Sequence, residues 1–156
     1  MSEAATTALV PLWIDRATGQ LVVADQLRLQ GGMTAAAALA CLANLAPTWQ
    51  KRGTMHSTVT VRGLALGGLP AHLICSFTDD TLRSVTFGVV LPDPELIDGW
   101  PSRATSEREV MVIRDALRGM LGPDFAATQT FHWGDVYAGI QDREGTAHAG
   151  IRYAAM

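Results

Sequence analysis

Residues 106–123, SEREVMVIRDALRGMLGP, decide the fold because they hold both ends and the apolar face of one helix. Ser106 and Glu109 have the spacing of a capping box, which starts a helix. The apolar residues recur every three or four positions and therefore share one face: Val110, Ile113, Leu117, Met120 and Leu121. Because Gly122 and Pro123 stop a helix, we predict one from Ser106 to Leu121.

An aromatic hairpin is predicted after this helix, from Phe131 to Tyr153. Its first strand, 128–140, would place Phe131, Trp133 and Tyr137 on one side and His132, Val136 and Ala138 on the other. A turn centred near Arg143 would pair His132 with Ala154, away from His148. The aromatic residues have two interpretations: core beneath the helices, which we favour, or an interaction surface.

The middle of the chain repeats this order of a helix followed by strands. Thr34 can cap a helix from Thr34 to Ala46, which Pro47 ends. Strands are predicted from Met55 to Arg62 and on either side of an Asp79-Asp80 turn. In that hairpin the expected pairs are Phe77 with Leu82, Cys75 with Ser84, and Ile74 with Val85. Both faces of the hairpin are then apolar, with Ile74, Val85 and Phe87 on the face opposite Cys75 and Phe77. We therefore expect helices to pack on one face and another part of the protein or a partner to pack on the other. A second subunit is one candidate.

Two helix-then-hairpin units in tandem predict an α+β fold. We expect an antiparallel sheet of about seven strands with two helices packed on one face. The chain of 156 residues is close to the usual size of one domain. Since no linker or low-complexity tract interrupts it, we predict a single domain over residues 1–156.

Composition and charge exclude several classes of function. The formal net charge is −3 and Lys51 is the chain's one lysine, so no basic patch is available for nucleic acid or an anionic membrane. No apolar run approaches the ~18 residues of a membrane span, and the N-terminus lacks the features of a signal peptide. We therefore expect a cytoplasmic protein, in which Cys41 and Cys75 are buried thiols rather than a disulfide.

The sequence predicts no assembled catalytic, metal or cofactor site. His72 and Cys75 are three residues apart on a predicted strand. Their side chains would point to opposite faces, so they cannot bind one metal ion or act as nucleophile and base. The glycine-rich runs lack the residues of a phosphate-binding loop. We expect no catalytic residue, no metal ligand and no cofactor, and a protein that is not an enzyme.

Six residues are candidates for a binding surface. Trp100 lies in a proline-rich loop, where a tryptophan is hard to bury, and Glu95 and Asp98 would stand at its rim. The other three, on the predicted hairpin, are Trp133, Asp135 and Tyr137. Asp135 has two interpretations: a partly buried general base with a raised pKa, or a polar residue at a strand bulge beside Gly134, which we favour.

Two motifs carry a resemblance to known families. The first is Gly31-Gly32-Met33-Thr34, a helix, strands, and then residues 77–85, FTDDTLRSV. It resembles the helix–sheet module of β-lactamase-inhibitor-type and outer-membrane-assembly lipoprotein domains. The second runs from Ser106-x-x-Glu109 to Trp133-Gly134 and Tyr153. It is similar to small bacterial proteins encoded beside secreted toxins, some of which are immunity proteins. The resemblance carries over no functional residue.

We therefore expect a non-catalytic bacterial protein-binding domain, such as an immunity-type inhibitor that covers the active site of a toxin. Its partner would be that toxin or, in a homodimer, a second copy of the chain. The alternative is a small-molecule-binding protein or small enzyme with a pocket between helix and sheet, using Asp135, His132 and Tyr137. A self-associating structural protein is a third hypothesis.

Overall fold

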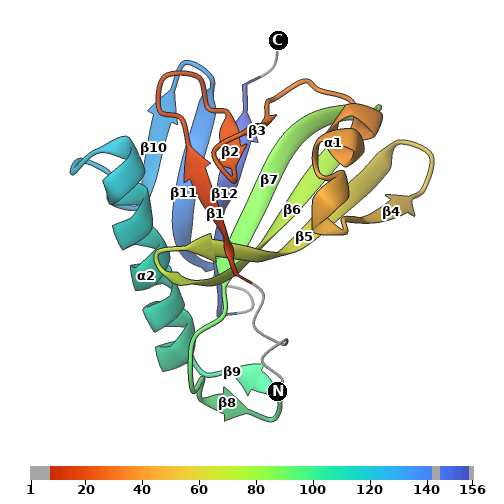
Figure 1. The fold of residues 1–156 in the computed structure, drawn as a ribbon. Coiled ribbons are helices and arrows are strands. Elements are labelled where there is room, and N and C mark those ends of the chain that lie inside the picture. Colours follow the sequence, from red (N-terminus) through yellow and green to blue (C-terminus); the bar gives the residue numbers. More distant parts are fainter. Residues whose placement is uncertain (1–7, 142–144, 155–156) are drawn as a thin grey trace.

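A sheet of ten strands makes up most of the structure (Figure 1). The computed structural model describes residues 8–141 and 145–154. Within them the strands follow the order β10-β11-β12-β7-β6-β5-β1-β2-β3, and β4 pairs with β5 outside this path. Their bounds are β1 Val10–Ile14, β2 Leu21–Val23, β3 Leu27–Leu29, β4 Thr48–Arg52, β5 His56–Leu66, β6 Leu69–Thr78, β7 Thr81–Val89, β10 Thr128–Phe131, β11 Gly134–Gln141 and β12 Thr146–Tyr153. A separate two-stranded sheet joins β8 (Leu96–Ile97) to β9 (Trp100–Pro101).

The helices α1 (Ala35–Cys41) and α2 (Arg103–Leu121) lie on the same side of the sheet (Figure 1). The first packs on β3 and β5, and the second packs on β11, β12 and β7 and also contacts β1. A short 3-10 helix, η2 (Ala43–Leu45), follows α1. Among the described residues, neither helix is both long and apolar enough to cross a membrane.

The predicted antiparallel sheet of about seven strands in tandem helix–hairpin units is wrong. The sheet is mixed, because β1 pairs in parallel with β5 at Val10 and Leu64. It is also larger, because β1, β2 and β3 extend one end and β10 extends the other. Strands of three to five residues carry little periodicity. A parallel pair joins segments that are far apart in the chain, so no local sequence pattern predicts the pairing.

The side of the sheet that faces the helices forms the core. The buried strand residues on this side are Val59, Val61, Leu73, Cys75, Phe77, Val85, Phe87, Val136, Ala138, Ala149 and Ile151. Ile113, Leu117 and Leu121 of α2 pack against them. Burial raises the pKa of the Cys75 thiol to about 12, so this cysteine is an uncharged core residue. Cys41 is half-buried rather than buried.

The N-cap of helix α2 lies four residues earlier than the capping box predicts, and the helix begins at Arg103. Ser102 is its N-cap, and its hydroxyl oxygen accepts a hydrogen bond from the Thr105 backbone N–H at 3.1 Å. Ser106 is buried within the first turn. Glu109 lies farther along the helix, where its carboxylate accepts a hydrogen bond from the Val89 backbone N–H. The prediction of Ser106 as the N-cap is therefore wrong, because Ser102 is a serine of the same capping ability that lies one helical turn earlier.

The Asp79-Asp80 turn connects β6 to β7 and also holds the start of α1. Both aspartates have left-handed backbone angles, with φ of 51° and 60°, which suits a two-residue hairpin turn. Thr34 caps α1 as predicted, and the Asp80 carboxylate accepts a second hydrogen bond from the Ala35 N–H at 3.2 Å. The helix ends at Cys41, earlier than expected.

The predicted register of this hairpin is correct only next to the turn. Phe77 faces Leu82, but a bulge between Ser76 and Phe77 shifts the remaining pairs by one residue. Cys75 therefore faces Val85 and Ile74 faces Thr86. A one-residue shift moves side chains to the other face. Val85 and Phe87 consequently join the core, and the expectation that they form an outer apolar face is wrong.

The terminal hairpin also differs from its prediction. Residues 128–140 form two strands, because Phe131 pairs with Gly134 across a turn at His132-Trp133. Gly134 then faces Tyr153, and Ala154 donates its N–H to the Trp133 carbonyl rather than pairing with His132. The predicted turn near Arg143 lies outside the described residues. The break at His132-Trp133 separates Trp133 from the face that carries Tyr137.

Candidate functional site

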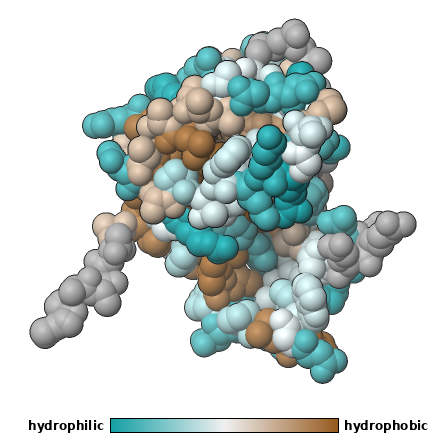
Figure 2. Space-filling model, turned by 90° about the vertical axis from the view of Figure 1, so that its right-hand side faces the viewer, coloured by the Kyte–Doolittle hydropathy of each residue, from teal (hydrophilic) through white to brown (hydrophobic). Residues whose placement is uncertain are grey.

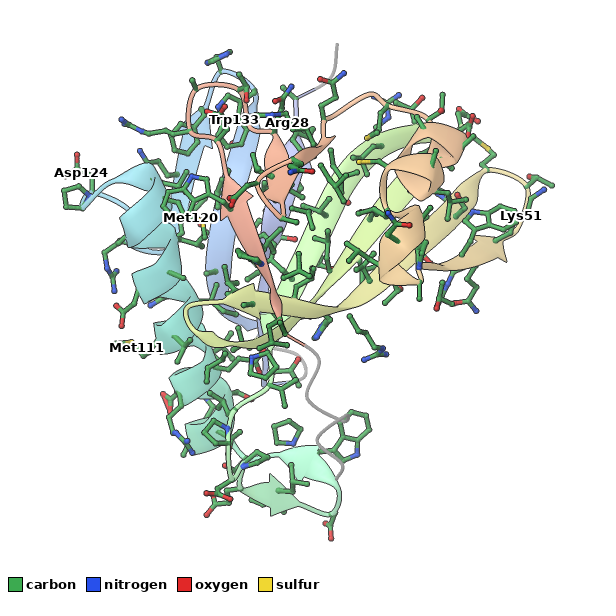
Figure 3. All side chains as sticks on the ribbon, in the orientation of Figure 1. Arg28, Lys51, Met111, Met120, Asp124 and Trp133 are labelled. Atoms are coloured by element: carbon green, nitrogen blue, oxygen red, sulfur yellow. The ribbon has the colours of Figure 1, made fainter. Side chains whose placement is uncertain are left out.

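The six predicted binding residues lie on three parts of the molecule. Glu95, Asp98 and Trp100 lie on or beside the hairpin β8–β9, which projects beyond one end of the sheet (Figure 1). Asp135 and Tyr137 lie on β11, on the side of the sheet away from the helices. Trp133 lies at the other end of the sheet, beside the loop between β1 and β2 (Figure 3). The structure does not bring the six residues into one site.

The hairpin β8–β9 exposes large apolar side chains to solvent. Leu96, Ile97 and Trp100 are 54%, 62% and 71% exposed. Figure 2 shows hydrophobic and hydrophilic residues mixed at the lower end of the molecule, where the hairpin projects. An isolated two-stranded hairpin is only marginally stable. Large apolar side chains that such a hairpin exposes to solvent do not stabilise the fold. Three such side chains together are typical of a protein-binding surface.

Hydrogen bonds fix the hairpin to the start of α2. Asp98 and Gly99 form its turn with φ of 53° and 84°. At its base, the Thr105 hydroxyl accepts from the Glu95 N–H and donates to the Glu95 carbonyl, both at 2.9 Å. The Ser102 N–H donates to the same carbonyl. The hairpin is therefore held in a defined direction, which reduces the entropy lost on binding.

Removing the Thr105 hydroxyl should loosen this attachment. Thr105 is buried, and Thr105→Val keeps its shape. The variant would leave the Glu95 N–H without a partner, while the Glu95 carbonyl keeps its bond from the Ser102 N–H, and it should lower the free energy of unfolding by about 1–2 kcal/mol. Urea unfolding measures the change. Thr130→Val, at an exposed edge-strand position, is the control and should change stability by less than about 0.5 kcal/mol. Equal stability of the two variants would contradict the attachment.

An apolar groove of about 500 Å³ lies at the base of the hairpin. Met111, on the outer side of α2, is one of its apolar walls (Figure 3). Its lining residues are Leu69, Leu91, Pro92, Glu107, Arg108, Met111 and Val112. The chain runs directly from Leu91-Pro92 into the hairpin and returns through α2, so groove and hairpin are neighbouring parts of one end of the molecule.

Trp133 is a structural residue that holds the β1–β2 loop. Its indole Nε1–H donates to the Arg16 carbonyl at 2.8 Å, and its ring stacks on Phe131 at 4.7 Å. Tyr153 makes a second hydrogen bond to this loop, because its hydroxyl donates to the Gly19 carbonyl at 3.0 Å. A cleft of about 390 Å³ beside them is lined by Thr18, Gln20, Gln30, Gly31, His132, Trp133, Tyr153 and Ala154.

Tyr137 is the centre of an ordered group on the other side of the sheet. Its hydroxyl lies over Gly150, 2.9 Å from where a Cβ of that residue would stand. The Arg152 guanidinium lies over the tyrosine ring at 4.7 Å, and the His148 ring is 4.9 Å away. Burial raises the pKa of the Tyr137 hydroxyl, opposed by the Arg152 charge. Only a glycine at position 150 lets the ring lie against the sheet in this way.

The pocket expected between helix and sheet, lined by Asp135, His132 and Tyr137, is not found among the described residues. His132 lines the cleft beside Trp133, whereas Tyr137 lines a different hollow at the edge of β11. The space between α2 and the sheet is filled by buried apolar residues such as Ile113 and Val136. Within the described ranges, no three His, Cys, Asp or Glu side chains come close enough to hold a metal ion.

His72 and Glu109 are neighbouring titratable groups whose pKa values are both shifted. Both lie against Gly88, with the His72 Nε2 and the Glu109 Oε2 at 3.0 Å and 3.2 Å from where its Cβ would stand. Burial lowers the pKa of His72, helped by the nearby Arg62 charge. Burial also raises the pKa of Glu109, opposed by its bond to the Val89 N–H. Each group is thus shifted toward its neutral form.

Sequence reasoning missed Leu96 and Ile97, the other exposed residues of the hairpin. The signal was present: Asp98-Gly99 is a dipeptide strongly favoured in two-residue hairpin turns, and it lies between Leu96-Ile97 and Trp100-Pro101. The region was instead predicted as a loop because of its prolines.

Comparison with known proteins identifies a likeness in fold. No family model and no curated protein matches the sequence. A chain of the solved structure described as "Rhs1-CT in complex with cognate immunity protein RhsI1" is similar, with a TM-score of 0.51 and 14% sequence identity. The match covers 91% of this chain and 86% of that chain. At this identity the likeness concerns the fold.

Proposed function

We propose that the protein is a non-catalytic, immunity-type inhibitor that binds a bacterial toxin in the cytoplasm through the hairpin β8–β9. The proposal rests on the exposure of Leu96, Ile97 and Trp100 on a projecting hairpin that hydrogen bonds hold to α2. A tryptophan held in this way is the residue type that most often dominates binding energy. The apolar groove beside the hairpin offers a second contact for the same partner.

The likeness in fold supports this class of function. The similar chain belongs to a complex that contains an immunity protein and its cognate Rhs1-CT. An inhibitor of this kind needs a stable fold with a complementary surface and needs no catalytic set. A toxin whose active site receives the hairpin would be blocked by occlusion, because substrate and hairpin would compete for the same space.

Co-expression with the toxin encoded by a neighbouring gene tests the proposal. The wild-type chain should restore growth and bind the purified toxin domain. Trp100→Ala should weaken binding by about 2 kcal/mol, which raises Kd roughly 30-fold. Isothermal titration calorimetry measures this change.

Trp13→Ala is the matched control, because Trp13 is also exposed, at 49%, but lies on β1 away from the hairpin. Its Kd should stay within about twofold of wild type, as for a residue outside the interface. Failure of the wild-type chain to bind or protect would refute the proposed function.

A further inference from the structure

The side of the sheet away from the helices is a second candidate binding surface. Two rows of paired residues run across seven strands on this side, which we call the open face. The first row is Thr48, Thr60, Ile74, Thr86, Gly150, Tyr137 and Thr128. The second is Gln50, Thr58, Ser76, Ser84, Arg152, Asp135 and Thr130. Short hydroxyl side chains predominate, and none of these residues is fully buried except Gly150.

Three arginines on the open face, Arg52, Arg62 and Arg152, lack a carboxylate partner within the described part of the chain. Arg52, at the end of β4, donates to the Gln50 side-chain oxygen, and the other two carry the argument below. Arg152 stands directly opposite Asp135 on the neighbouring strand, yet the arginine ion pairs in residues 8–141 and 145–154 belong to Arg28 and Arg118. Arg152 lies over the Tyr137 ring instead. Arg62 is exposed at a bulge in β5 beside His72.

A guanidinium placed over an aromatic ring keeps its N–H donors available. Its planar fork matches a carboxylate and can bind one through two hydrogen bonds. Tyr137 also restricts the movement of Arg152, so less side-chain entropy is lost when a carboxylate binds. Arg152 is therefore prepared to receive an acidic group from outside the chain.

The distance between the two arginines favours a large partner. Three strand spacings and about four residues along the strands separate Arg62 from Arg152, which places them on the order of 20 Å apart. One small molecule does not span that distance, whereas a protein surface does. The carboxylates that face this surface are Asp135 and, at its edge, Glu109, which is held by the Val89 N–H. The chain's net charge of −3 disfavours nucleic acid, whose binders usually carry a basic patch, so we expect a protein partner.

We propose that the open face is a second docking surface, and that it binds an acidic surface of the partner protein through Arg62 and Arg152. This inference rests on the proposed function, since the partner is the same toxin. The open face adjoins the hairpin, because β7 ends beside His72 and leads through Val90 into β8. One partner can therefore contact both surfaces.

Surface plasmon resonance with the neighbouring-gene toxin domain, at 50 and 300 mM salt, tests this surface. The double variant Arg62→Glu/Arg152→Glu should associate about 10-fold or more slowly at low salt, because like charges repel at encounter. The difference should shrink at high salt, where exposed charges are screened. Arg152→Lys keeps the charge but loses the fork, and it should dissociate faster with little change in association.

Lys51→Glu on β4 is the control (Figure 3): it reverses one positive charge, where the double variant reverses two, and Lys51 lines a hollow beside Ala35 of α1 instead of the open face. It should associate within about twofold of wild type. Wild-type kinetics in the double variant, combined with weak binding by Trp100→Ala, would overturn the second surface and leave the proposed function intact. Absence of wild-type binding would overturn both. Binding of a duplex oligonucleotide by the wild type, lost in the double variant, would overturn the assignment to a protein partner.

Discussion

Phe77→Ala should lower the free energy of unfolding by about 4 kcal/mol, the largest single effect expected in this fold. Phe77 is among the largest fully buried side chains and lies opposite Leu82 and Ser57, near the end of the central strand β6. Its removal loses buried apolar area and leaves a cavity that paired strands cannot easily close. Small domains are stable by only about 5–15 kcal/mol, so this loss is a large fraction of the total.

Urea unfolding followed by circular dichroism measures this change. Ser76→Ala is the control, because it is the adjacent residue but lies on the open face. It should change stability by less than about 0.5 kcal/mol. If Phe77→Ala and Ser76→Ala were equally stable, the assignment of the two faces of β6 would be wrong.

Gly150→Ala should lower the free energy of unfolding by about 3 kcal/mol, because the added Cβ overpacks the sheet instead of leaving a cavity. A Cβ at position 150 would lie 2.1 Å from the Val85 carbonyl oxygen and 2.9 Å from the Tyr137 hydroxyl. The first contact is with backbone, so β7 and β12 would have to separate where Gly150 faces Thr86. Overpacking of this kind costs about 1–3 kcal/mol, and we expect the upper end because the strands are paired on both sides.

Gly119→Ala provides a control of opposite sign. Gly119 is in α2, and a Cβ there would meet nothing within 4 Å. Replacing a helical glycine with alanine should stabilise the protein by about 0.5–1 kcal/mol. The same change at two glycines would then have opposite effects on the urea midpoint. A stabilising Gly150→Ala would contradict the close approach of β7 and β12.

Local features of this fold were predictable from the sequence. Thr34 caps α1, Asp79-Asp80 turns a hairpin and Cys75 is buried, because each depends on a few neighbouring residues. Non-local features were not predictable. The bulges near Phe77 and Arg62 and the parallel pairing of β1 with β5 arise from contacts between distant segments. A bulge shifts the alternation by one, which reverses the face predicted for every residue beyond it.

The candidate surfaces likewise have a local part that the sequence predicts and a non-local part that it does not. Trp100 was predicted as a binding residue from its loop, and the structure leaves it exposed. Its neighbours Leu96 and Ile97 required recognition of the Asp98-Gly99 turn. The open face could not be predicted, since Arg62 and Arg152 share it only through the order in which β5, β6, β7 and β12 pair.

The most direct test of the proposed function is a structure of this chain bound to its partner toxin. We predict that the Trp100 side chain, 71% exposed in the free protein, is buried against the toxin together with Leu96 and Ile97. A complex in which Trp100 stays exposed to solvent would contradict the assignment of the hairpin as the principal binding surface.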